Sequence, residues 1–159
     1  MKVLLAVLVS GTVTVAQAQA PSPASSRTMV SASDVAAMIA KAKAERKDQP
    51  NIAQSMIQLA PYNVSLEYRA SVGNAAVHET EAELFYVVDG SATLVTGGTL
   101  TDSTRNGANL TGKGIQGGTS RKVAKGDFIM VPEGQAHWFS AIDGTVVLMS
   151  LHLPHAPAK

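Results

Sequence analysis

Four histidines and three closely spaced glutamates are the side chains of this sequence best suited to chemistry. The histidines are His78, His137, His152 and His155, and the glutamates that follow the first of them are Glu79, Glu81 and Glu83. Three negative charges within five residues repel one another unless a positive group lies among them or water screens them. A bound cation is one such group, and two imidazoles with one carboxylate form a ligand set suited to Zn(II), Fe(II) or Mn(II).

His137 directly follows a stretch with strong turn chemistry. Pro132 fixes φ and Gly134 supplies a positive φ, and the apolar run 128–131 precedes them. A histidine held just past a rigid turn is well aimed to bind a metal ion or to act as a base. The alternative is a histidine whose ring is hydrogen-bonded at a barrel mouth without any metal.

The other histidines and glutamates leave alternatives open. His78 fits either a metal ligand or a plain polar loop residue, and His152 fits a packed or rim histidine that is also a reserve ligand. Glu79 or Glu81 could act as a general base if burial raises its pKa. Glu83 either points inward or is a solvated carboxylate on a surface strand.

The first twenty residues have the composition of a secretory signal peptide rather than a membrane span. Lys2 precedes an almost wholly apolar or small stretch, 3–15, and two small-x-small cleavage signals end at Ala18 and Ala20. We therefore predict a signal peptide over residues 1–18, with cleavage after Ala20 as the alternative. The protein should be periplasmic or secreted, with no membrane partner after cleavage.

The mature chain divides into a linker, one helix and a region of strands. Residues 19–30 are rich in Pro, Ser and Ala, which predicts a disordered linker. Ser31 or Ser33 caps an amphipathic helix predicted within residues 31–50. Residues 51–155 alternate short apolar runs with turn signals, which predicts an all-β sandwich or barrel.

Two Asp-Gly pairs and one glycine-rich stretch set the expected connections. Asp89-Gly90 and Asp143-Gly144 are hairpin signals between apolar runs. Residues 97–120 are rich in Gly, Thr and Asn, which predicts a loop or an irregular extended hairpin. This stretch lacks the strand-to-helix context of a phosphate-binding loop, so we reject that function for it.

Composition excludes several classes of function. The 159 residues suffice for one domain, and the absence of cysteine rules out disulfides, a thiolate nucleophile and Cys-ligated zinc. The sequence has 13 Lys and Arg against 12 Asp and Glu, and removing Lys2 with the signal peptide leaves 12 against 12. This neutrality, without a basic run, argues against nucleic acid or an anionic membrane surface as a partner.

The spacing around the turn resembles a known family signature. Gly126-x5-Pro132-x-Gly134-x2-His137 is similar to the second motif of the cupins, small metal-binding β-barrels of the jelly-roll type. The family pattern ends in Asn four residues after the His, where this chain has Ala141. The resemblance implies a single jelly-roll barrel, formed by the strand region, that holds one metal ion at its mouth.

The first cupin motif is matched in its second half, by Glu83-x6-Gly90. Its two histidines would fall on Ala76 and His78, so the resemblance implies the ligands His78, Glu83 and His137, with a fourth missing at Ala76. The missing ligand either opens a position for water or substrate or weakens metal binding, unless Glu79, Glu81 or His152 substitutes for it. Strand alternation raises a conflict, because His78 and Glu83 face opposite sides of an unbroken strand.

Three functions fit these expectations. The first is a metal-dependent enzyme acting on a small organic molecule, with the metal as Lewis acid or as the site of O₂ binding. The second is a non-catalytic protein that binds a small ligand. The third is an interaction role, since cupin-like barrels often form homodimers, with residues 97–120 contributing to association. The resemblance covers oxygenases, isomerases, lyases and simple binders, so it implies no particular reaction.

Overall fold

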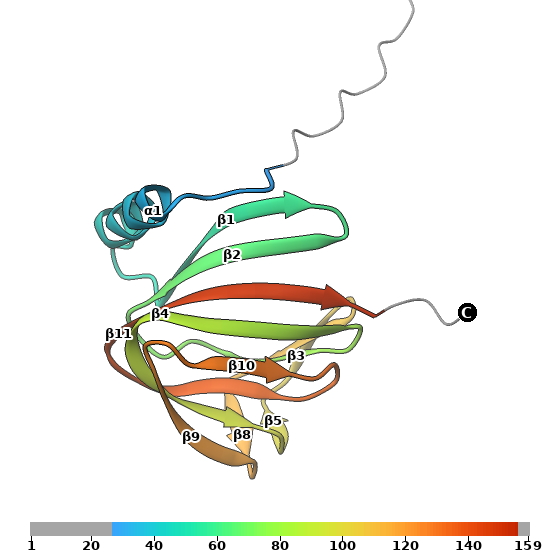
Figure 1. Ribbon diagram of the computed structural model, residues 1–159. Helices are drawn as coiled ribbons and strands as arrows, with labels where there is room; N and C mark the ends of the chain where they lie inside the picture. The colour runs from blue at the N-terminus through green and yellow to red at the C-terminus, as the bar shows by residue number, and fades with distance from the viewer. Residues whose placement is uncertain (1–26, 156–159) are drawn as a thin grey trace, which may run out of the picture.

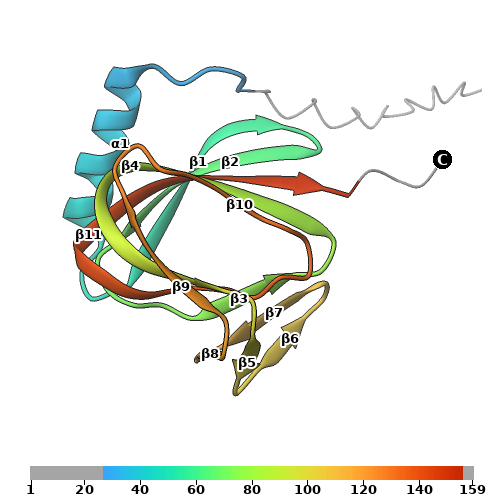
Figure 2. The same ribbon diagram turned by 60° about the horizontal axis from the view of Figure 1, so that its bottom comes forward.

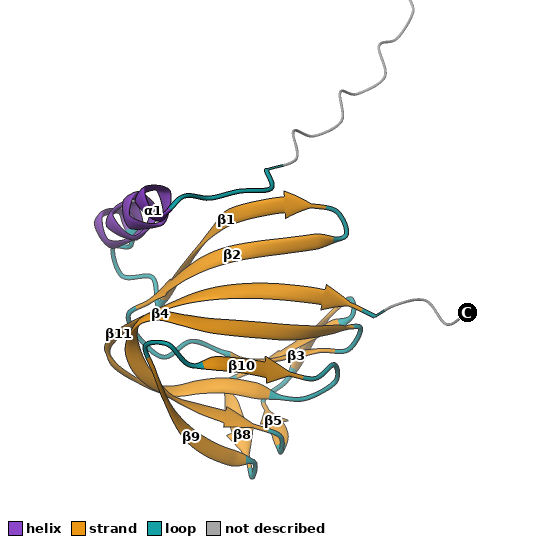
Figure 3. Cartoon of the chain, in the orientation of Figure 1, coloured by secondary structure: helices purple, strands orange, loops and turns teal. Residues whose placement is uncertain are grey.

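Two long strands, β4 (Glu81–Thr96) and β11 (His137–Pro154), run through the whole fold (Figure 1). The computed structural model describes residues 27–155, so the predicted signal peptide lies outside the described residues. Strands make up most of the described chain, which confirms the predicted all-β class (Figure 3). The other elements are α1 (Ala32–Glu45), β1 (Asn51–Leu59), β2 (Tyr62–Arg69), β3 (Ala75–His78), β5 (Thr99–Thr101), β6 (Thr104–Asn106), β7 (Asn109–Gly112), β8 (Gly114–Gln116), β9 (Thr119–Ala124) and β10 (Phe128–Val131).

The strands form a curved antiparallel sheet that surrounds an apolar interior (Figure 2). β4 pairs with β11 along one edge and with β9 and β10 along the other. β11 also pairs with β2, and β1 follows β2 at the end of the sheet. The interior side chains are large and fully or nearly fully buried, among them Phe85, Val87, Leu94, Val131, Phe139 and Leu148.

The hairpins predicted at the two Asp-Gly pairs are wrong. Gly90 lies inside β4 and Gly144 inside β11, with φ values of 80° and 78°. The two strands pair with each other on both sides of these glycines, from Ala92 with Ile142 to Gly90 with Val146. A glycine with positive φ in a paired strand makes a bulge that bends the strand, and here both strands bend together instead of reversing.

The bend depends on glycine at position 90 more than at position 144. A Cβ at Gly90 would lie 1.9 Å from the carbonyl oxygen of Thr145, whereas a Cβ at Gly144 meets no atom within 4 Å. We expect Gly144→Ala to lower the free energy of unfolding by about 1–2 kcal/mol, the cost of a left-handed backbone. Gly90→Ala adds the steric overlap and should lose about 3 kcal/mol or more. Urea denaturation measures both, and equal losses would contradict this account of the bend.

The N-terminal helix covers the outer face of the sheet near β1 and β2. Ser31 is its cap, in a capping box with Asp34, which settles the choice between the two predicted serines. The helix ends at Glu45, inside the predicted range 31–50, and Lys47 then takes a positive φ of 50°. A second apolar cluster lies between helix and sheet, made of Ala42, Met56, Leu66, Tyr68 and Val147.

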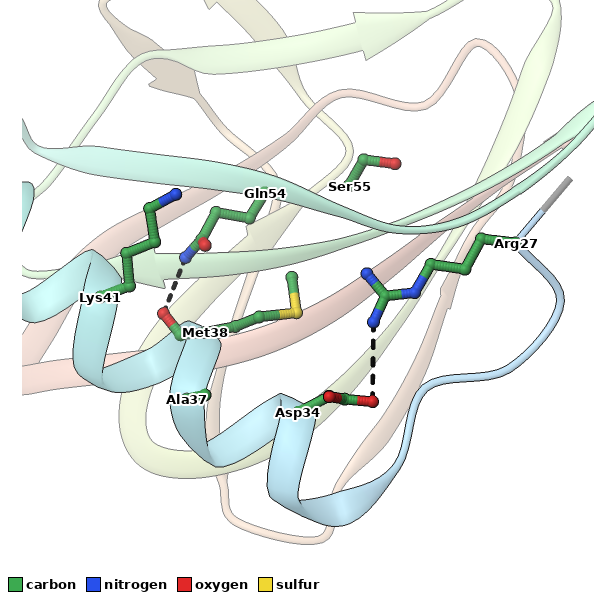
Figure 4. A pocket seen from close by; sticks show the side chains of 7 residues that line it. All are labelled: Arg27, Asp34, Ala37, Met38, Lys41, Gln54 and Ser55. Carbon is green, nitrogen blue, oxygen red and sulfur yellow. Dashed lines mark hydrogen bonds and ion pairs between the residues drawn. The ribbon is translucent and has the colours of Figure 1, made fainter. Parts of the chain in front are cut away.

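A cavity of about 500 Å³ opens between α1 and β1 (Figure 4). Gln54 donates a hydrogen bond to the carbonyl oxygen of Met38 across it, at 2.8 Å. Arg27 lies 3.6 Å from Asp34 at its edge, and the backbone of Arg27 forms an isolated bridge with Gln58. These contacts attach the helix and the last residues of the predicted linker to the sheet.

The glycine-rich stretch 97–120 is an irregular extended hairpin, the second of the two predicted forms. β5 pairs with β8, and β6 pairs with β7. β7 continues the pairing onto β3, so the stretch is attached to the strand that carries His78. Within residues 27–155 no helix is long and apolar enough to cross a membrane.

Candidate metal centre

A bend between β3 and β4 removes the conflict over which way His78 and Glu83 face. His78 is the last residue of β3, and β4 begins at Glu81. The backbone N–H of Glu79 donates to Ala108, and the carbonyl of Thr80 accepts from His155, at 3.0 and 2.9 Å. These contacts hold the bend. The alternation of side chains along β3 therefore does not continue into β4, and His78 and Glu83 can face the same side.

Three side chains from three strands meet at one point. The Nε2 atoms of His78 and His137 lie 3.3 and 3.1 Å from Oε2 of Glu83. The ligand atoms of all three residues lie within 4.8 Å of one another, so this group could hold a metal ion. The turn after Val131 is anchored to β3 by a hydrogen bond from the N–H of Gly134 to the carbonyl of His78, at 2.7 Å.

The Glu83 carboxylate is the strongest indication in this group that a cation binds there. Its side chain is 4% exposed, and Oε2 has no aligned hydrogen-bond donor among the described residues despite the two nearby ring nitrogens. Its other oxygen, Oε1, accepts a hydrogen bond from Ser150 Oγ at 2.5 Å. A buried carboxylate oxygen is costly unless it is paired or binds a metal, so the donor set fits a metal ion.

The electrostatics of the group keep Glu83 ionised. Burial raises the pKa of Glu83, but the contacts from His137, His78 and Ser150 outweigh burial and hold the pKa well below its ordinary value. In turn the Glu83 carboxylate raises the pKa of His78 above its ordinary value of 6.5, against the opposing effect of burial. Without metal, His78 therefore binds a proton more readily than a free imidazole does.

This proton competes with a metal ion, because only the neutral imidazole is a ligand. Metal affinity should be constant at a pH above the raised pKa of His78 and should fall as the pH drops through it. The expected slope is about one decade per pH unit for each proton displaced. Calorimetric titration of the metal-free protein with Zn(II) across a pH series measures this slope. An affinity that does not change with pH would contradict the assignment of His78 as a ligand.

The outer nitrogens of both imidazoles face oxygen atoms. Nδ1 of His78 lies 2.8 Å from Oδ1 of Asn109, and Nδ1 of His137 lies 3.5 Å from the carbonyl oxygen of Gln135. An oxygen that accepts from Nδ1–H leaves Nε2 free to bind a metal, as is usual for metal-ligating histidines. Asn109 and Ser150 were not predicted from the sequence as residues of the site.

The two glutamates predicted as general bases lie in different surroundings. Glu79 is held by Arg105 through contacts of 2.6 and 2.8 Å, which lower the pKa of Glu79. That direction is opposite to the raised pKa that a general base would need. Glu81 lies at the mouth of the site, where its Oε2 is 2.7 Å from Nδ1 of His152.

The remaining candidate positions are also placed by the structure. Ala76 pairs with His137 across β3 and β11, so the position of the missing ligand adjoins the site but supplies no donor atom. Nε2 of His152 lies 3.5 Å from Oε1 of Glu83. His155 is 63% exposed and contacts Glu133 at 2.9 Å, outside the group.

A curved antiparallel sheet that brings two imidazoles and a carboxylate together, where they could hold a metal ion, defines an all-β protein of the jelly-roll type. The cupin family model matches residues 43–157, and the chain belongs to the cupin family. The predicted resemblance and the jelly-roll architecture that it implied are thereby confirmed. No curated protein matches the chain.

Solved structures agree on the fold. KdgF from Halomonas sp. is 15% identical, with a TM-score of 0.51 over 69% of this chain and 84% of that one. FeII HppE is 12% identical, with a TM-score of 0.50 over 65% of this chain and 51% of that one. At these identities the likeness concerns the fold alone.

Proposed function

We propose that this protein is an exported single-domain cupin that binds one divalent metal ion through His78, Glu83 and His137 and uses it to bind or transform a small organic molecule. The observation that carries the proposal is the buried Oε2 of Glu83, which faces two ring nitrogens at 3.1 and 3.3 Å without an aligned donor. FeII HppE, which shares the fold, contains iron(II) by its name, which supports a metal in this scaffold.

The surrounding residues keep the three side chains in place. The ring of Phe85 lies 5.8 Å from the ring of His137, and Ser150 holds the second oxygen of Glu83. Packing and hydrogen bonds of this kind fix the orientation of metal ligands. A bound metal would supply Lewis acidity or a site for O₂. A metal held by these three ligands would keep a coordination position open for water or a small ligand, because Ala76 supplies no donor atom.

The second candidate function is a small-ligand-binding protein without turnover. The ion pair between Glu79 and Arg105 favours it, because the pair lowers the pKa of Glu79, one of the two bases predicted for an enzyme. Glu81 is then the remaining candidate for a general base. In both functions the protein binds a small molecule, and they differ in whether that molecule is converted.

A metal titration of chelator-treated mature protein tests the proposal. We expect Zn(II), Fe(II) or Mn(II) to bind with a stoichiometry of one and to raise the unfolding temperature, because a metal that binds only the folded state stabilises it. Protein that neither binds these ions nor gains thermal stability from them would refute the proposal.

Export and self-association are part of the proposal. The signal peptide predicted over residues 1–18 supports a periplasmic or secreted protein, and mass spectrometry of the exported chain would identify the cleavage site. A homodimer is proposed from the family resemblance. Light scattering measures the oligomeric state. The proposed partners otherwise comprise a small molecule and neither nucleic acid nor membrane.

A further inference from the structure

His152 is the titratable side chain at the site that the three-residue group leaves without a role. It lies on β11, directly paired with Glu83 on β4 and two residues beyond Ser150. We propose that His152 is the fourth protein ligand of the metal ion, in place of the side chain that Ala76 lacks. This inference rests on the proposed function, since it assumes that the metal centre exists.

All three imidazoles near Glu83 are oriented in the same way. Each ring directs Nε2 toward the Glu83 carboxylate and Nδ1 toward an oxygen atom further out. For His152 that oxygen is Oε2 of Glu81, at 2.7 Å, although the contact lacks hydrogen-bond alignment. A carboxylate on the far nitrogen is a common partner of a metal-ligating histidine, because it fixes the tautomer and makes the ring a stronger donor.

The position of the ring is compatible with ligation. Nε2 of His152 lies 3.5 Å from Oε1 of Glu83, while the other two imidazoles approach Oε2. The ring of His152 also contacts the ring of His78 edge-on, with centroids 4.8 Å apart and planes at 86°. His152 is not among the residues whose ligand atoms lie within 4.8 Å of one another, so ligation requires a shift of its ring toward Oε2; its side chain is 27% exposed and thus not fully enclosed by packing.

The other candidates for a fourth ligand are engaged elsewhere. Glu79 forms its ion pair with Arg105, and His155 contacts Glu133 at the surface. Glu81 contacts Nδ1 of His152, so it influences the three-residue group through the His152 ring. Among the described residues at the mouth, His152 is therefore the donor best placed to complete the set.

Titration with Co(II) tests the assignment, because its visible spectrum reports the number and type of ligands. We expect His152→Ala to weaken Co(II) binding by more than about 100-fold, beyond the loss typical of residues that only support a ligand, and to change the absorption spectrum of the bound ion. Glu81→Gln should weaken binding less and keep the spectrum, since it removes only the partner of the ring. His155→Ala is the matched control and should change neither.

A rescue variant separates ligation from a structural role. Ala76 and His78 have the same parity on β3, so a histidine at position 76 faces the same side as His78. Ala76→His combined with His152→Ala should restore the affinity and the spectrum of a four-ligand site.

The outcomes distinguish this inference from the proposal on which it rests. If wild-type protein binds one Co(II) and His152→Ala leaves affinity and spectrum unchanged, the inference fails and the three-residue centre stands. If wild-type protein binds no Co(II), both fail. If His152→Ala weakens binding and Ala76→His does not rescue it, His152 acts by maintaining local structure and the inference is overturned.

Discussion

Glu83→Gln should reduce the affinity of the protein for Zn(II) by more than about 100-fold, beyond the loss typical of residues that only support a ligand. Glutamine keeps the size of the side chain and the contact with Ser150, but it removes the anionic oxygen between His78 and His137. The variant also loses the carboxylate that raises the pKa of His78. His78 of the metal-free variant therefore binds a proton less readily, and metal binding displaces fewer protons from it. Calorimetric titration at a pH above the raised pKa of His78 isolates the loss of the ligand.

Glu79→Gln is the matched control for this experiment. Glu79 is close in sequence and is also a carboxylate, yet it is held by Arg105 outside the group. We expect it to keep wild-type affinity for Zn(II). Equal losses in the two variants would show that the effect arises from overall negative charge rather than from ligation by Glu83.

Phe85→Ala should lower the free energy of unfolding by about 3–5 kcal/mol. Phe85 is fully buried, its ring meets the ring of Phe139 edge-on at 5.4 Å, and it lies against His137. Truncation leaves a cavity and removes an aromatic pair, and it also frees the ring of His137. Urea denaturation with a chelator present measures the packing loss without a contribution from bound metal.

Phe128→Ala provides the contrast on the neighbouring strand. Its side chain is 68% exposed and contacts the ring of Tyr86 at 5.8 Å. We expect a loss of only about 0.5 kcal/mol, as for other surface substitutions. Equal losses in the free energy of unfolding for the two variants would contradict the assignment of Phe85 to the hydrophobic core.

Local signals predicted the start of the helix and the turn before His137. The capping chemistry of Ser31 with Asp34 acts within four residues, so the sequence alone reveals it. The Pro132 and Gly134 turn is equally local, and the family spacing ties it to His137. Both features depend on backbone preferences that the rest of the fold does not override.

The course of β4 and β11 could not be predicted from the same kind of signal. An Asp-Gly pair suits a hairpin turn and a bent strand equally well, because both need a positive φ at glycine. Which one forms at Gly90 and Gly144 depends on pairing partners far apart in sequence. Here β4 pairs with β11 on both sides of each glycine, so the chain continues past the bend.

The candidate site was predictable where a motif carries it and not elsewhere. His78, Glu83 and His137 follow from charge and family spacing. The bend at Glu79 and Thr80 that brings two of them together depends on backbone contacts with residues 108 and 155, which the local sequence does not reveal. The roles of Ser150 and Asn109 depend on strand register, which places them beside Glu83 and His78.

A crystal structure of the metal-loaded protein, with anomalous data collected at the absorption edge of the metal, tests the central claim most directly. We predict one strong anomalous peak at about 2.0–2.2 Å from Nε2 of His78, Nε2 of His137 and a carboxylate oxygen of Glu83. A peak bound to other residues, or metal-loaded protein in which these three side chains contact only one another, would contradict the account.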